Sequence, residues 1–314
     1  MRMQKIALAL GGGAAKGWAH IGFLRALNEA GIHPDIITGT SMGAVSGGCW
    51  AAGKLDALED FARSLTPRRV FSFMDISLSG SGLINGGRLG TELEKHLGEG
   101  DIVDLSIPFC CMATELDNGN EIWLTQGRLA TALQASYALP GIFRPVAIDG
   151  RWLVDGALVN PVPVSAARAL GGDYVIAVSL STQGVGHGTV ISGLTPARMA
   201  TDLDVHNNVE SNLANESEQQ TSGSVKRRLR RQIIGSGEGA PGITSVMMQS
   251  YNIIQDRIAR SRLAGDPPDL LIKPKVHDIG LFDFHRADEA IKAGYDAAQP
   301  AIAQLVQEPD LSTA

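Results

Sequence analysis

The sequence predicts an α/β fold in which a mostly parallel central sheet is flanked by helices on both faces, a three-layer α/β/α architecture. Short apolar runs alternate with helical patterns along much of the 314-residue chain. The runs at 6–10 and 173–180 are mostly apolar, as is typical of strands buried on both faces. Two apolar runs near the N-terminus each enter a glycine-containing turn and then a helical pattern, which indicates strand–turn–helix units.

The first half of the chain contains these units in order. The strand expected at 6–10 is followed by a helix whose apolar residues recur at spacings of three. The second strand, at 36–38, leads into a pattern of small residues over 42–52 that favours a closely packed helix. The next elements expected are strands at 108–115 and 121–125 and a helix at 129–138.

The second half begins with a predicted β-hairpin, because an Asp-Gly pair at 149–150 lies between two apolar runs. The run 173–180 is expected to be a central strand of the sheet. A helix at 244–263, a strand at 270–274 and a closing helix at 286–306 complete the predicted elements.

No clear linker separates a second core, so residues 1–314 are expected to form a single domain. Gly, Ser, Asn, Gln and Thr cluster in the stretch after the central strand, and helical or strand periodicity fades there. This composition predicts a flexible insertion over 183–244. The remainder, 245–314, is expected to be a helical extension that packs on the core.

A basic segment lies within this predicted insertion. It contains Lys226, Arg227, Arg228, Arg230 and Arg231, and apolar residues are interleaved at spacings of four. As a helix the segment would be basic on one face and apolar on the other, which suits docking on an anionic lipid surface. A solvated surface helix and a contact between two copies of the chain remain open as alternatives.

The most informative motif surrounds Ser41. The pentapeptide from Gly39 to Gly43 fits the G-x-S-x-G nucleophile elbow, and it lies between an expected strand and an expected helix. A sharp turn there exposes the serine hydroxyl, and flanking glycines avoid Cβ clashes. In a chain with 37 glycines the same pattern also arises as an ordinary Gly-Ser turn. The motif therefore predicts a nucleophile only with support from other segments.

A glycine-rich loop before the first helix gives one such support. Gly11, Gly12 and Gly13 present backbone N–H groups that could hold a phosphate or an oxyanion. A dinucleotide-binding G-x-G-x-x-G would need glycine where the chain has Lys16, and the P-loop spacing is absent. We therefore expect an oxyanion hole, because a candidate nucleophile follows one strand–helix unit later.

Asp155 gives the second support. It ends the second strand of the predicted hairpin and precedes Gly156, which allows close approach of the backbone. Asp-Gly pairs are also common in surface turns, and the pair alone would favour that interpretation.

These segments, in this order, resemble the patatin-like phospholipases. The resemblance includes the block Ala135–Pro145 and covers roughly residues 5 to 180. The segment from about 251 to 295 is similar to small stand-alone bacterial members related to the neuropathy-target-esterase branch. The glycine loop departs from the family's pattern, because its spacing from Gly11 through Gly13 to Gly17 is longer.

The resemblance implies a serine–aspartate dyad, with Ser41 as the nucleophile and Asp155 as its partner. It implies that amides around Gly12 and Gly13 hold the oxyanion, and Lys16 matches the basic residue common at the end of the loop. The implied reaction is hydrolysis of acyl esters of phospholipids or lysophospholipids. A simple carboxylesterase or thioesterase and a non-catalytic regulatory or binding module remain as alternatives.

A histidine triad is a further alternative, because the order Ser, acid, His is that of α/β-hydrolases. None of the histidines that follow Asp155 lies in a recognisable loop signature. These are His187, His206, His277 and His285. His20, one turn into the first helix, is expected to be a packed residue.

Composition excludes several classes of function. A net charge of −6 gives no general basic field for nucleic acid. Three cysteines without C-x-x-C spacing indicate buried reduced thiols and a reducing compartment, and no metal-binding pattern is present. We expect no metal or cofactor, no signal peptide and no transmembrane helix, hence a cytoplasmic protein with peripheral membrane contact. The sequence leaves homodimerisation open.

Overall fold

The protein is described here by a computed structural model that places residues 4–73, 91, 94–95, 97–181 and 243–307. The insertion expected at 183–244 lies outside the described residues, apart from 243 and 244. The basic segment within it, with Lys226, Arg227, Arg228, Arg230 and Arg231, also lies outside them, as do His187 and His206.

Contacts along the chain group its residues into two units. One comprises 1–182 and 255–314 and contains the sheet. The other comprises 183–254, of which the described part is the first portion of helix α10 (Ile243–Gly265). The expected division into a single domain, an insertion and a C-terminal extension stays a prediction.

The sheet is mixed and mostly parallel, as the sequence predicts. Within the described residues its strand order is β5-β6-β3-β2-β1-β7-β8, and β4 also pairs with β3. The strands that pair in parallel are β3, β2, β1, β7 and β8. The antiparallel pairs are β3 with β4, β3 with β6, and β5 with β6. The strands are β1 (Ile6–Leu10), β2 (Ile36–Thr40), β3 (Phe109–Glu115), β4 (Glu121–Leu124), β5 (Val146–Ile148), β6 (Arg151–Asp155), β7 (Tyr174–Val178) and β8 (Leu270–Ile272).

The helices predicted at 42–52, 129–138, 244–263 and 286–306 are confirmed, with their ends shifted by at most two residues. The α-helices are α1 (Ala19–Glu29), α2 (Met42–Ala51), α3 (Leu55–Arg63), α4 (Pro67–Phe73), α6 (Leu129–Ser136), α7 (Val164–Ala169), α10 and α11 (Ala287–Leu305). Short 3₁₀ turns are η1 (Ala14–Trp18), η2 (Ile102–Asp104), η3 (Gly156–Leu158) and η4 (Phe284–Arg286). The hairpin β5–β6 is confirmed, with its two-residue turn at Asp149 and Gly150 both at positive φ.

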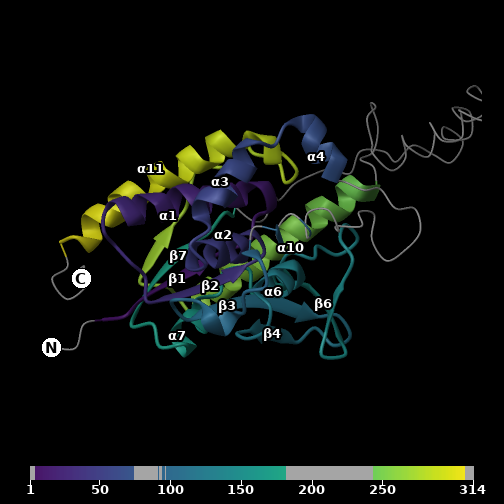
Figure 1. Cartoon of the computed structure of the whole chain (residues 1–314), viewed down its shortest axis with the longest axis horizontal. Helices are drawn as coiled ribbons and strands as arrows, with labels where there is room; N and C mark the ends of the chain where they lie inside the picture. Colours follow the sequence, from purple (N-terminus) through teal and green to yellow (C-terminus); the bar gives the residue numbers. More distant parts are fainter. Residues whose placement is uncertain (1–3, 74–90, 92–93, 96, 182–242, 308–314) are drawn as a thin grey trace, which may run out of the picture. The chain divides into compact units, whose positions relative to one another are not determined.

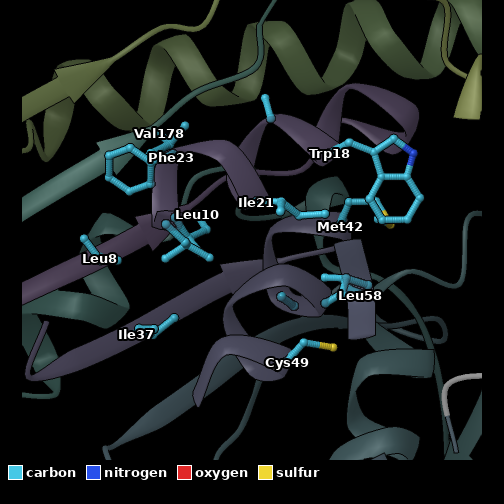
Figure 2. Packing of buried hydrophobic residues seen from close by; sticks show 14 of the residues in the cluster. Leu8, Leu10, Trp18, Ile21, Phe23, Ile37, Met42, Cys49, Leu58 and Val178 are labelled. Atoms are coloured by element: carbon cyan, nitrogen blue, oxygen red, sulfur yellow. The ribbon is translucent and has the colours of Figure 1, made fainter. Parts of the chain in front are cut away.

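Helices cover both faces of the sheet, because alternate side chains of β1 enter different clusters. Leu8 and Leu10 join the larger core, which includes residues of α1, α2 and α11. Ala7 and Ala9 join a second cluster with residues of α7 and with Ala259 of α10. Figure 2 shows part of the larger core, where side chains from β1, β2 and β7 meet those from α1 and α2. The predicted three-layer α/β/α architecture is therefore confirmed.

The three cysteines are buried and form no disulfide, as the sequence predicts. Burial raises the pKa of the Cys49 thiol to about 12, so this thiol stays protonated at neutral pH. No helix in the described part of the chain is both long and apolar enough to cross a bilayer.

Helix α11 runs alongside α1, and two glycines set the distance between them (Figure 1). A Cβ atom on Gly22 would lie 1.8 Å from the Ile291 carbonyl oxygen, and one on Gly294 would lie 1.8 Å from the Ala19 carbonyl oxygen. Both contacts are with backbone, which cannot rotate away. Helix α11 can therefore pack this closely against α1 only because Gly22 and Gly294 have no side chains.

We predict that Gly22→Ala lowers the free energy of unfolding by about 1–3 kcal/mol or more, since the methyl group must push the two helix backbones apart. Gly265→Ala is the matched control, because a Cβ there meets nothing within 4 Å. Urea denaturation measures both variants. Equal stability of Gly22→Ala and the parent would show that the close approach of α1 and α11 is wrong.

Candidate active site

Strand β3 aligns the ends of two other strands. β4 pairs with one edge of β3, along Cys111 to Thr114. β2 and β6 pair with residues in this same stretch, so both must lie on the other edge of β3. On that edge β2 ends with Thr40 opposite Met112. β6 runs the other way and ends with Asp155 opposite the next residue, Ala113. The two strands meet end to end, so Ser41, directly after Thr40, is brought to Asp155.

The hydroxyl of Ser41 donates a hydrogen bond of 2.8 Å to Oδ2 of Asp155. Both residues are buried, with 6% and 2% of their surface exposed. The other carboxylate oxygen, Oδ1, accepts from the Ala157 amide at 2.9 Å, because Asp155 caps the short η3 turn. Thr114 Oγ1 donates to the Asp155 carbonyl at 2.9 Å. The carboxylate is thus fixed by contacts on both oxygens and on its own main chain.

Ser41 has the strained backbone expected of a nucleophile elbow. Its φ of 54° and ψ of −124° lie in a region that non-glycine residues rarely adopt. The flanking glycines are sterically required. A Cβ on Gly39 would lie 2.5 Å from Ala44 Cα, and one on Gly43 would lie 2.2 Å from the Leu10 carbonyl oxygen. Helix α2 can therefore begin immediately after Ser41.

Gly156, directly after Asp155, is also sterically required to be glycine. A Cβ there would lie 2.3 Å from the carbonyl oxygen of Met112 on β3. The turn after Asp155 can consequently pass close to the strand that also aligns Ser41.

The glycine loop passes beside Ser41 and Ala157. A Cβ on Gly12 would lie 3.5 Å from Ser41 Cβ and 3.4 Å from Ala157 Cβ. The amide of Gly11 already donates to the Val178 carbonyl, and that of Gly12 donates to the Pro161 carbonyl, each at 2.9 Å. Both bonds hold the loop in place, and neither amide is available to a ligand in this conformation.

Amides without an acceptor among the described residues include those of Gly13, Ala14 and Met42. Gly13 and Ala14 continue the loop, and Ala14 has a positive φ of 47°. Met42 is the first residue of α2, where amides lack partners within the helix. The sequence singled out Gly11, Gly12 and Gly13, but only the last has an amide open to an oxyanion.

Lys16 lies at the end of the loop and is buried, with 8% of its surface exposed. Its amide donates to the Gly13 carbonyl at 3.1 Å, so only its ammonium group could contact a ligand. Burial lowers the pKa of Lys16, and the negative charge of Asp256 partly opposes this. Asp256 itself pairs with Arg260 at 2.9 Å and accepts from the Ser181 hydroxyl.

His20 holds the loop at Gly11. It is fully buried, and its Nε2 lies 2.7 Å from the Gly11 carbonyl oxygen, so Nε2 carries the proton and donates. Nδ1 has no partner among the described residues. Burial lowers the pKa of His20 to about 4 and the bond to Gly11 partly opposes this, so the ring is neutral at pH 7.

The other described histidines do not reach Ser41. His277 is exposed and pairs with its neighbour Asp278 at 3.3 Å, and His285 is also exposed. Within the described residues no cluster of side chains is arranged to hold a metal ion.

Sequence reasoning missed the contribution of the turn after α6. Ser136 Oγ accepts a hydrogen bond from the Ser41 amide, and the Ala138 carbonyl accepts one from the Asp155 amide, each at 2.9 Å. The block Ala135–Pro145 carried the only signal, since it was part of the family resemblance. No local pattern within it indicates these contacts.

Comparisons with known proteins identify the family to which the chain belongs. A model of the patatin-like phospholipase family matches residues 8–168. The chain is 32% identical over 340 residues to an uncharacterized NTE family protein of Mycobacterium tuberculosis, covering 99% of this chain and 94% of that protein. It is 25% identical over 311 residues to the lysophospholipase nte1 of Neurospora crassa, covering 97% of this chain and 19% of the fungal protein.

Among solved structures, VipD from Legionella pneumophila has a TM-score of 0.47 and 14% sequence identity, covering 99% of this chain and 70% of VipD. The family match extends over more than half of the residues, from β1 to α7. The chain therefore belongs to the patatin-like phospholipase family, as the order of its motifs predicts. Membership of this family indicates a hydrolase of lipid esters.

We predict that the stability of the fold falls as the pH drops from about 6.5 to about 4 because of His20. In the unfolded chain His20 takes up a proton near pH 6.5, whereas the folded protein keeps it neutral down to about 4. Protonation in this window favours unfolding by up to about 3 kcal/mol.

Urea denaturation of the parent and His20→Gln across this pH range tests the prediction. Gln keeps a donor for the Gly11 carbonyl but does not titrate, so its stability should depend less on pH. An equal pH dependence in both proteins would contradict the assignment.

Proposed function

We propose that this protein is a serine acyl hydrolase that cleaves acyl esters of phospholipids or lysophospholipids with a Ser41–Asp155 dyad. The observation that carries the proposal is the 2.8 Å hydrogen bond from the Ser41 hydroxyl to the Asp155 carboxylate at a strained elbow. The lipid substrate class is supported by membership of the patatin-like phospholipase family and by relatives named lysophospholipases.

In the first step, Ser41 Oγ attacks the ester carbonyl carbon while its proton passes to Oδ2 of Asp155. A tetrahedral intermediate forms, and the carbonyl oxygen becomes an oxyanion. When this intermediate collapses, the bond to the alcohol breaks, and the protonated Asp155 gives its proton to the departing oxygen. The products of this step are an acylated Ser41 and the free alcohol, a lysolipid or a glycerophospho-alcohol.

In the second step, water attacks the acyl carbon and Asp155 accepts the proton of that water. The bond between Ser41 and the acyl group breaks, Ser41 recovers its proton from Asp155, and the fatty acid leaves. The fixed carboxylate suits both steps, because the Ala157 amide holds Oδ1 and leaves Oδ2 directed at the hydroxyl. No reorientation of the base between the steps is required.

The oxyanion would be held by amides of Gly13, Ala14 and Met42, since these have no acceptor among the described residues. Gly13 and Ala14 follow Gly12, which lies beside Ser41, and Met42 directly follows Ser41 at the start of α2. One well-placed donor of this kind contributes roughly 3–4 kcal/mol to the stabilisation of a transition state. The Lys16 ammonium would add positive charge near the same loop.

The alternative functions that the sequence left open differ from this proposal in the esters that the protein would hydrolyse. A simple carboxylesterase or thioesterase would use the same atoms and differ only in the acyl group it accepts. A non-catalytic module would show no turnover of any ester. A panel of phospholipids, lysophospholipids, acyl thioesters and p-nitrophenyl esters therefore separates the three.

We predict that Ser41→Ala and Asp155→Asn each lower kcat for a lysophospholipid by at least about 10³-fold. The first removes the nucleophile, and the second keeps the shape of the carboxylate but cannot accept the proton. Release of fatty acid by the purified protein measures both.

His277→Ala is the control for the triad alternative and should keep the activity of the parent, because this histidine is exposed and pairs with Asp278. Full activity of Asp155→Asn, together with loss of activity in His277→Ala, would refute the dyad.

A further inference from the structure

The turn that ends helix α6 contacts the main chain of both dyad residues. The Ser41 amide donates to Ser136 Oγ at 2.9 Å, and the Asp155 amide donates to the Ala138 carbonyl at 2.9 Å. Ser41 and Asp155 are 114 residues apart in sequence, yet both of these contacts come from three consecutive residues of one turn. The turn thus links the two halves of the site independently of strand β3.

The contact on Ser41 differs from the contact on Asp155 in one respect. The Ala138 carbonyl belongs to the backbone and is present whatever the side chain, whereas the acceptor for Ser41 is a side-chain hydroxyl. Ser136 is fully buried on the inner side of α6, so no solvent could replace that hydroxyl. The Ser41 amide would lose its only hydrogen-bond acceptor among the described residues if Ser136 were changed to alanine.

The Ser41 amide belongs to the peptide that joins Thr40 to Ser41, and Ser41 has a φ of 54°. The orientation of that peptide sets where the Ser41 side chain leaves the backbone, and therefore the direction of Oγ. A strained residue persists only where its surroundings hold it in place. The hydroxyl of Ser136 is one such restraint, since it fixes the N–H at the point where the strand turns into the helix.

We propose that Ser136 is a positioning residue for the nucleophile, acting through the Ser41 amide rather than on the substrate. This inference rests on the proposed function. Loss of the acceptor should lower the rate at which Ser41 attacks and leave substrate binding largely unaffected. A displacement of reacting atoms by about 1 Å can lower a rate by roughly 100-fold, so even a small rotation of this peptide has a measurable effect.

Two variants separate the hydrogen bond from packing. Ser136→Ala removes the acceptor and a small volume, whereas Ser136→Cys keeps the volume but offers sulfur, a weak acceptor. Ser46→Ala is the matched control, because Ser46 is also fully buried and its hydroxyl has no partner among the described residues. Ser46 lies on α2, the helix that follows the nucleophile.

The experiment measures kcat and KM for a lysophospholipid, the rate at which a fluorophosphonate labels Ser41, and the free energy of unfolding. We expect Ser136→Ala and Ser136→Cys to lower kcat and the labelling rate roughly tenfold or more, with KM within about twofold of the parent. Ser46→Ala should keep both rates within about twofold. The Cys variant decides the result if the Ala variant is poorly folded.

Three outcomes would overturn the proposal. Parent-like kcat and labelling in both Ser136 variants would show that the hydroxyl does not position Ser41. Loss in Ser136→Ala with full rates in a stable Ser136→Cys would assign the effect to packing. An inert parent whose Ser41 is not labelled would refute the proposed function, and the inference would fall with it.

Discussion

Everything at the site depends on one edge of strand β3, where a parallel and an antiparallel neighbour end against each other. β2 and β6 pair with adjacent stretches of that edge, and their last residues lie opposite Met112 and Ala113. Backbone hydrogen bonds of the sheet therefore determine the distance between the residues that follow and end these strands. The 2.8 Å contact between Ser41 and Asp155 is a consequence of sheet register, with side-chain contacts refining it.

The site is almost entirely buried, so its polar side chains need hydrogen-bond partners within the protein. Each has a defined partner: the carboxylate of Asp155 accepts from Ser41 and Ala157, and the imidazole of His20 donates to the Gly11 carbonyl. Burial keeps His20 neutral at pH 7, so its ring adds no positive charge to the loop that it contacts. Among the described residues of the loop and of the start of α2, the amides of Gly13, Ala14 and Met42 have no acceptor. Such an arrangement suits a negative charge that develops only during reaction.

The sequence predicts correctly those parts of the structure that depend on a short, local pattern of residues. The strand–turn–helix around Ser41, the hairpin before Asp155 and the order of strands and helices all follow from glycine positions, turn residues and hydrophobic patterns, and the structure contains them as predicted. The contacts that depend on partners far along the chain could not be predicted. Only the pairing of Gly11 and Gly12 with Val178 and Pro161 reveals that their amides are occupied. Likewise nothing near Ser136 in sequence shows that its hydroxyl reaches Ser41.

In the proposed mechanism the Ser41 hydroxyl, the Asp155 carboxylate and the amides of Gly13, Ala14 and Met42 surround a single point. A crystal structure of the protein after reaction with an alkyl fluorophosphonate tests this most directly, because the adduct resembles the tetrahedral intermediate. We expect phosphorus bonded to Ser41 Oγ, with the phosphonyl oxygen within hydrogen-bond distance of amides among Gly13, Ala14 and Met42. A phosphonyl oxygen directed away from all three, or an adduct on another residue, would contradict it.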